Sequence, residues 1–250
     1  MCLIVFAWRP GHPQPLVLAA NRDEFHARHC LPLSAWEEFP GVYAGRDLQA
    51  GGTWMGTTAN GRFAAVTNIR DPQQIKGARS RGELPLDFLR SELGAAEYLQ
   101  HLLPHIGEYS GFNLLLGDTQ ALYFLNSAAG QIRRLEAGIY GVSNADLDTP
   151  WPKLQRAKAA LAAVLDDPQP QQLFALLADP TPAADDELPD TGIGLSGERL
   201  LSSVFIHSPG YGTRASSVLL TDAQRRQQFI ERSYDNHGQP CGEVSLSLGP

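Results

Sequence analysis

Short runs of consecutive apolar residues, separated by turn-forming residues, dominate the first third of the chain. Cys2–Trp8 and Leu16–Ala20 are apolar at successive positions instead of alternating. Such strands are covered on both faces, as they are in the middle of a layered fold. Pro/Gly and Asn/Gly turns delimit further predicted strands at Val42–Ala44, Thr53–Thr57 and Arg62–Asn68. The pattern therefore predicts antiparallel hairpins with helices packed outside them.

The rest of the chain alternates pairs of helices with groups of strands. Leu and Phe recur at helical spacing in the first pair, and helices are predicted at Leu84–Leu93, Ala95–His105, Lys153–Leu165 and Pro170–Ala178. Strands are predicted at Phe112–Gly117, Ala121–Asn126, Ile132–Glu136, Ile139–Ser143, Ser202–His207, Arg214–Leu220, Gln227–Tyr234 and Glu243–Leu248. The segment Gln227–Tyr234 is ambiguous between strand and helix. This order of elements favours a sandwich, with the irregular stretch Pro180–Gly197 as a lid or binding loop.

Composition restricts the class of protein. The chain has 250 residues, is 43% hydrophobic and carries a net charge of -7, which indicates one soluble domain over residues 1–250 and no nucleic-acid partner. No basic residue precedes the first apolar run and Arg9 interrupts it, so neither a secretory signal nor a membrane span is predicted, and we expect a cytoplasmic location. Cys2, Cys30 and Cys241 lack metal-ligand spacing, so no metal site is predicted.

Cys2 is the candidate nucleophile. Removal of Met1 would leave one residue with both a thiol and a free α-amine, whose unperturbed pKa values are about 8.5 and about 8. The amine could then serve as the base for the thiol, which is the chemistry of an N-terminal-nucleophile hydrolase. The alternative is that Cys2 is a small apolar residue at the start of a buried strand.

A polar tetrad, Asn21-Arg22-Asp23-Glu24, directly follows the second apolar run. Such groups are costly to bury unless they pair or serve a site. Arg22 could hold the thiolate or a substrate carbonyl, and Asp23 could orient the α-ammonium of Cys2. The alternative is an ion-paired strand terminus.

Three further polar residues lie at strand ends. Asn68 and Asn144 each end an apolar strand, where a side-chain amide can donate hydrogen bonds to an oxyanion; the alternative is that each Asn starts a turn. Arg214 could clamp a carboxylate or support the nucleophile, or form a structural ion pair. We expect these residues to converge on one pocket with Cys2, where Arg22 and Arg214 should lower the pKa of its thiol.

These short motifs, taken in their order along the chain, resemble the NRDE-motif family, also called the transport and Golgi organisation protein 2 family. The matching segments are Cys2, Asn21–Glu24, Gly51–Gly56, Thr67–Arg70, Gly141–Asn144, Thr149–Lys153 and Tyr211–Arg214. The resemblance implies an α+β fold of N-terminal-nucleophile type, a four-layer αββα sandwich of two antiparallel sheets between helical layers. The other polar or aromatic residues in these motifs, Asn21, Glu24, Trp54 and Thr213, are predicted to bind substrate.

The same positions resemble, more distantly, the choloylglycine hydrolase and penicillin V acylase group. That resemblance implies Cys2 as nucleophile, Arg22 and Asp23 as its neighbours, Asn68 and Asn144 near the oxyanion, and Arg214 beside the thiol. The Arg and Asp are adjacent here and farther apart in those amidases, so the resemblance does not fix which of the two overlays its counterpart.

The lead prediction is a cysteine amidohydrolase that acts on a linear C–N amide and requires no cofactor. The family resemblance also implies a competing function, intracellular haem trafficking or the handling of acyl lipids. In that case the same cleft would carry haem or an acyl-CoA as cargo. Either way, the predicted partner is a small molecule.

Overall fold

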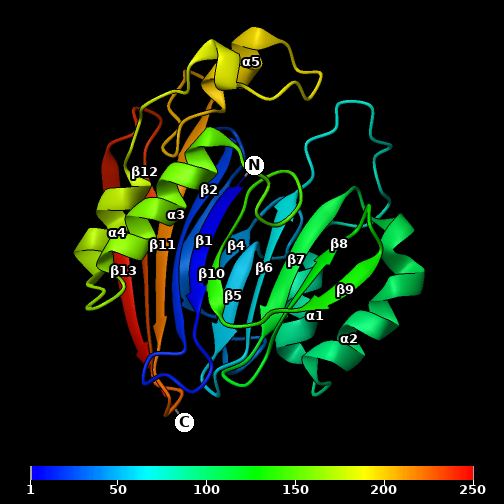
Figure 1. The fold of residues 1–250 in the computed structure, drawn as a ribbon. Coiled ribbons are helices and arrows are strands. Elements are labelled where there is room, and N and C mark those ends of the chain that lie inside the picture. The colour runs from blue at the N-terminus through cyan, green and yellow to red at the C-terminus, as the bar shows by residue number, and fades with distance from the viewer. Residues whose placement is uncertain (1, 250) are drawn as a thin grey trace.

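Two antiparallel sheets, stacked face to face, form the middle of the molecule (Figure 1). The structure is a computed structural model that describes residues 2–249. The first sheet has the order β10-β1-β2-β11-β12-β13, with strands β10 (Gly138–Val142), β1 (Cys2–Trp8), β2 (Leu16–Phe25), β11 (Tyr211–Thr221), β12 (Gln227–Tyr234) and β13 (Pro240–Leu248). The second sheet runs in sequence order, with strands β3 (Cys30–Ala35), β4 (Val42–Asp47), β5 (Met55–Thr58), β6 (Phe63–Asn68), β7 (Phe112–Gly117), β8 (Leu122–Asn126) and β9 (Gln131–Arg134).

Helices cover the outer face of each sheet. Helices α3 (Pro152–Val164) and α4 (Pro170–Leu177) pack on the first sheet, and α1 (Glu83–Arg90) and α2 (Ala95–Leu102) pack on the second (Figure 1). Three apolar cores separate the layers, one between the sheets and one under each pair of helices. The four-layer αββα sandwich of the α+β class is therefore confirmed.

The apolar runs are fully buried because β1 has a core on both sides. Its even-numbered residues, such as Phe6, face the second sheet, and its odd-numbered residues, such as Val5, pack under α3 and α4. Successive side chains of a strand point to opposite faces, so a strand between two cores has no polar face. Strand β2 alternates in the same way and lies between β1 and β11.

The prediction and the structure differ at two segments. Residues 202–207 form no strand; only an isolated bridge joins His207 to Gly212, and side chains hold much of the segment, since Asn21 donates to the Val204 carbonyl. Strand β3 was not predicted, because Pro32 interrupts its pattern. The register of β3 against β4 shifts at this point, as expected where proline removes a ladder hydrogen bond.

The irregular stretch contains little regular structure. A 3-10 turn, η2 (Asp185–Glu187), and the short helix α5 (Leu195–Leu200) lie in or beside it, and a second 3-10 segment, η1 (Leu103–Glu108), follows α2. No helix within residues 2–249 is long and apolar enough to cross a membrane.

Candidate active site

A cavity of about 610 Å³ lies where β1 begins and β2 ends. Its wall includes most of the predicted site residues: Cys2, Arg22, Asp23, Glu24, Trp54, Asn68 and Arg214. Both sheets contribute, because Cys2 and Arg22 are paired across β1 and β2, whereas Asn68 ends β6 of the second sheet. Residues far apart in the sequence therefore meet in one cavity, as the sequence predicts; Asn144 is the catalytic candidate that does not line it.

Burial dominates the electrostatics of Cys2, which is 7% exposed. Burial raises the pKa of the thiol and Asp23 raises it further, while Arg22 and the backbone N–H of Asp23 act to lower it. Arg22 thus acts in the predicted direction, but burial outweighs it, so the predicted net lowering of the Cys2 pKa is wrong. Arg214 makes its hydrogen bond elsewhere, donating from Nη1 to the His26 carbonyl over 2.9 Å.

Asp23 lies directly behind Cys2 and is 1% exposed. The hydroxyl of Thr213 donates to its Oδ1 over 2.8 Å. Burial raises the pKa of the Asp23 carboxyl; the opposing influences include the positive charge of Lys153, the Thr213 hydrogen bond and Arg22. The carboxyl is thus surrounded by groups that favour its ionised form, in a place that disfavours any charge.

Asn68 and Asn144 are in direct contact. Asn144 Nδ2 donates to the backbone carbonyl of Asn68 over 3.0 Å, and the Ser143 hydroxyl lies 3.1 Å from Asn144 Oδ1. The Ser143 hydroxyl also lies 3.0 Å from the carbonyl of Cys2, so Ser143 links Asn144 to the start of β1. One N–H of the Asn144 amide is therefore used within the protein, and Asn68 has the more direct access to the cavity.

Two predicted substrate-binding residues face away from the cavity. Asn21 Nδ2 donates to the carbonyls of Leu177 and Val204, each over 2.9 Å, on the helix side of the first sheet. The Thr213 hydroxyl donates to Asp23, and its oxygen accepts from the N–H of Ile206 over 2.9 Å. Asn21 and Thr213 are fully hydrogen-bonded within the protein, so the substrate-contact interpretation is corrected for both. Glu24 and Trp54 do line the cavity.

The loop between β6 and α1 lines the cavity, whereas the stretch 180–197 does not. The part of this β6–α1 loop that lines the cavity runs from Lys76 to Gly82. It includes Arg81, which donates to the Gly111 carbonyl over 3.1 Å. At Gly77 an added Cβ would approach the Tyr109 backbone to 2.3 Å, so only glycine allows the loop to pack there. The predicted lid over the cavity is therefore wrong for 180–197.

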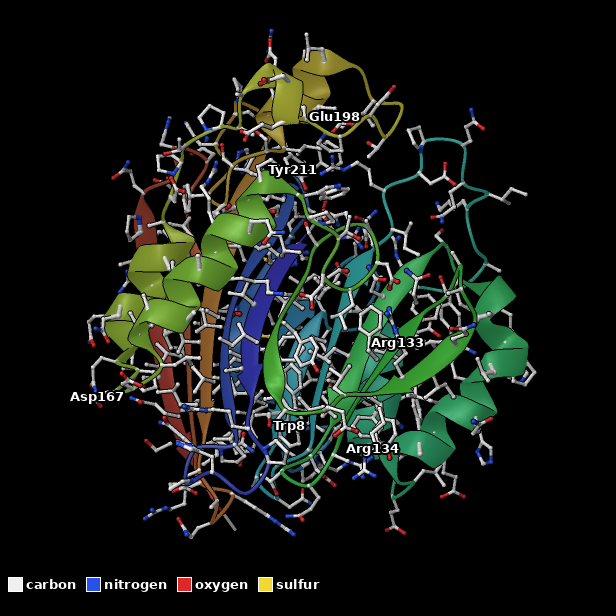
Figure 2. All side chains as sticks on the ribbon, viewed as in Figure 1. Trp8, Arg133, Arg134, Asp167, Glu198 and Tyr211 are labelled. Atoms are coloured by element: carbon white, nitrogen blue, oxygen red, sulfur yellow. The ribbon has the colours of Figure 1, made fainter. Side chains whose placement is uncertain are left out.

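A buried charged cluster on the helix side was not predicted. Lys153 lies in the first turn of α3 and is 1% exposed. Burial lowers its pKa to about 8, and Asp23 is the charge that most opposes this. Arg70 forms an ion pair of 2.7 Å with Glu198, and both side chains are buried. Figure 2 shows Glu198 and Tyr211 at this same end of the molecule. The only signal in the sequence was the position of Arg70 and Lys153 inside two of the matched motifs.

Sequence comparison identifies the family. The family model described as "Transport and Golgi organisation 2" matches residues 1–236. The chain is 35% identical over 256 residues to the human Transport and Golgi organization protein 2 homolog, covering 93% of each chain, and 34% identical over 260 residues to the Bos taurus homolog, again covering 93% of each. The Drosophila melanogaster protein is 30% identical, with 96% of this chain and 95% of that one covered. The chain belongs to the Transport and Golgi organisation 2 family.

The fold of this Transport and Golgi organisation 2 member is shared with solved hydrolase structures. A mutant conjugated bile acid hydrolase from Clostridium perfringens matches with a TM-score of 0.57 over 99% of this chain and 92% of that one, at 7% sequence identity. A second variant of the same enzyme matches with a TM-score of 0.56 at 8% identity. At such low identity the likeness establishes the N-terminal-nucleophile type of sandwich alone.

Proposed function

We propose that this protein is an N-terminal-cysteine amidohydrolase that cleaves a linear C–N amide bond. The observation that carries the proposal is the position of Cys2 in the wall of the cavity, with Arg22 and Asp23 beside it and Asn68 opposite on the second sheet. The shared fold supports it, because the name of the compared structure is that of a hydrolase of conjugated bile acids.

The reaction follows from this arrangement. After removal of Met1, the α-amine of Cys2 takes the thiol proton, and the thiolate attacks the amide carbonyl carbon to form a C–S bond. Asn68 is the proposed donor to the resulting oxyanion, a contribution of about 3 kcal/mol in other enzymes, and Asn144 holds the Asn68 backbone in place. The ammonium returns the proton to the leaving nitrogen as the C–N bond breaks. The amine then activates water, which releases the acid and restores the thiol.

Removal of Met1 also changes the thiol itself. The raised pKa of the buried Cys2 thiol would leave little thiolate at neutral pH. In the trimmed chain the α-ammonium lies on the same residue as the thiol, where its positive charge favours the ionised form. Met1 lies outside the described residues, so its removal stays a prediction. The proposal requires it.

The second candidate is a carrier that uses the same cavity for haem or an acyl-CoA. One observation favours it: Arg81 and Arg214 line the cavity and form no ion pair with a carboxylate among residues 2–249, so both are available to an anionic cargo. Propionates or phosphates would suit such guanidinium groups. Iron ligation would fall to a thiol, since Cys2, Cys30 and Cys241 all line the cavity.

A paired measurement distinguishes the two functions. Mass spectrometry first establishes that Met1 is absent from the purified wild type. Hydrolysis of a panel of N-acyl amino acids and titration with haem are then measured on wild type, Cys2→Ser and Cys241→Ser. An amidohydrolase loses at least about a thousandfold in rate in Cys2→Ser, because a serine hydroxyl is a poor nucleophile near neutral pH, and keeps activity in Cys241→Ser. Tight stoichiometric haem binding without turnover of any amide would overturn the proposal in favour of the carrier.

A further inference from the structure

Lys153 occupies a place that is unfavourable for a lysine. Its side chain is 1% exposed, and its Nζ makes no hydrogen bond to any described residue. It also lies in the first turn of α3, where the helix dipole disfavours a positive charge. A packing role would be filled better by leucine or methionine, because a buried ammonium without a partner costs free energy. The position therefore calls for a role that uses the charge.

The charged groups around Lys153 come from four parts of the chain. Cys2 on β1, Asp23 on β2, Arg70 after β6 and Glu198 on α5 all act on its pKa. Arg70 and Glu198 are paired with each other. A small cavity of about 10 Å³, room for about one water molecule, lies between them and Lys153.

Asp23 is the group on which Lys153 acts most clearly. Among the charges that influence the Asp23 carboxyl, Lys153 is the strongest. Lys153 Nζ donates no hydrogen bond to a described residue, so its influence on Asp23 is electrostatic and acts in a buried region, where charge interactions are weakly screened. Tyr211 on β11 faces the same group of charges, and Asp23 and Arg70 both influence it.

We propose that Lys153 is a positioning residue, which supplies the positive charge against which Asp23 ionises behind Cys2. This inference rests on the proposed function, in which an ionised Asp23 holds the α-ammonium of Cys2. Without the lysine, the buried carboxyl binds a proton instead, and the amine loses its anchor. Because burial lowers the pKa of Lys153 to about 8, its charge is present at neutral pH and is lost in mildly alkaline solution.

The first test measures the charge of Asp23 directly and requires no substrate. The protein is labelled with [4-¹³C]aspartate, and the Asp23 carboxyl resonance is assigned by its absence from Asp23→Asn. Its titration midpoint should rise by about one pH unit or more in Lys153→Met and stay near the wild-type value in Lys153→Arg. Lys158→Met is the matched control, since Lys158 lies on the same helix and pairs with Asp148 instead. Thermal unfolding of each variant verifies that it folds.

The second test concerns the reaction. The activity of wild type should fall on the alkaline side near pH 8, and Lys153→Arg should move this limit to higher pH, whereas Lys153→Met should lower the rate about tenfold or more. A folded Lys153→Met with an unchanged Asp23 midpoint would overturn the inference, as would an unchanged pH profile in Lys153→Arg. If wild type hydrolyses no amide, the proposed function fails, and the carboxyl titration alone decides whether Lys153 controls the charge of Asp23.

Discussion

The two faces of the first sheet differ sharply at the end where β1 begins. On the cavity face, charged side chains retain contact with solvent: Arg28 pairs with Asp47, and these side chains are 30% and 16% exposed. On the helix face, Arg70 pairs with Glu198, and these side chains are 5% and 4% exposed. The ion pair beside the cavity is thus better solvated than the ion pair near the helices.

Two adjacent residues of β2, Arg22 and Asp23, lie where these faces meet. Both residues contribute to the wall of the cavity, but the Asp23 carboxyl is held by the Thr213 hydroxyl and is 1% exposed. Charge interactions are much weaker where solvent reaches them than in the interior. The cavity face can therefore adapt its charges to a ligand, while the helix face fixes the charge state of Asp23 before any ligand arrives. The following predictions test this difference, beginning with the largest effect.

Breaking the ion pair on the helix face should have the largest effect on stability. Glu198→Gln removes the buried carboxylate that pairs with Arg70 Nη1, and we expect a loss of about 3 kcal/mol or more in the free energy of unfolding. Urea denaturation measures this loss. Arg28→Gln on the cavity face is the control and should cost about 1 kcal/mol or less. Equal losses in the two variants would remove the distinction between the faces.

Buried Lys153 should make stability depend on pH in a known direction. Its folded-state pKa of about 8 lies below the ordinary value of 10.5, so the unfolded chain binds more protons between these values. Stability then rises with pH across that window. Relative to Lys153→Met, the unfolding free energy of wild type should increase by about 3 kcal/mol between pH 8 and pH 10.5. Urea denaturation at pH 8 and at pH 10.5 measures this increase. If wild type gained as much unfolding free energy relative to Lys158→Met, Lys153 would be ruled out as the source.

The hydrogen bond from Thr213 to Asp23 should contribute a smaller amount. Thr213→Val removes a hydroxyl that donates to a buried carboxyl, and we expect a loss of about 2 kcal/mol in the free energy of unfolding at neutral pH. Thr119→Val is the control, because the Thr119 side chain is also buried but makes no side-chain hydrogen bond among residues 2–249. A loss no larger than that of the control would show that Asp23 does not depend on Thr213.

Alkylation of the cysteines tests the cavity face. In an N-terminally tagged chain the nitrogen of Cys2 is an amide, and its buried thiol should react with iodoacetamide about tenfold more slowly than the exposed Cys241. In the chain trimmed to Cys2 the new α-ammonium should reduce or reverse this difference. Peptide mapping after limited labelling measures the ratio. An unchanged ratio after trimming would contradict the role assigned to the amine.

The sequence predicts the layers of this fold well, because the layers depend on hydrophobic periodicity. It does not predict β3, where Pro32 interrupts the pattern, or the true course of residues 202–207, where side chains replace ladder bonds. The sequence brings Cys2 and Arg22 together correctly. It cannot predict whether burial or the charge of Arg22 dominates the pKa of the Cys2 thiol, because the burial comes from residues distant in the chain.

The prediction that Asn21 binds substrate is wrong because of where the strand was expected to end. The apolar run Leu16–Ala20 predicts that the strand ends before the tetrad, whereas β2 continues through the tetrad to Phe25. Alternation from the apolar residues of β2 places Asn21 and Asp23 with the helices and Arg22 with the cavity. Lys153 could not be found this way, because nothing local distinguishes it from an exposed lysine in a first helical turn. It is buried by tertiary packing, with Arg70 and Glu198 beside it around the same small cavity.

The strand order also fixes when the site can be completed during synthesis. Strand β1 is made before the strands that flank it and β2 in the sheet. Strand β10, which pairs with β1, ends at residue 142, and β11, which pairs with β2, ends at residue 221. At about 5–20 residues per second, the ribosome needs on the order of ten seconds or more to produce these partners. Throughout that interval the beginning of the chain has no cavity around it and is open to a processing aminopeptidase. Maturation of Cys2 is therefore expected to precede its burial.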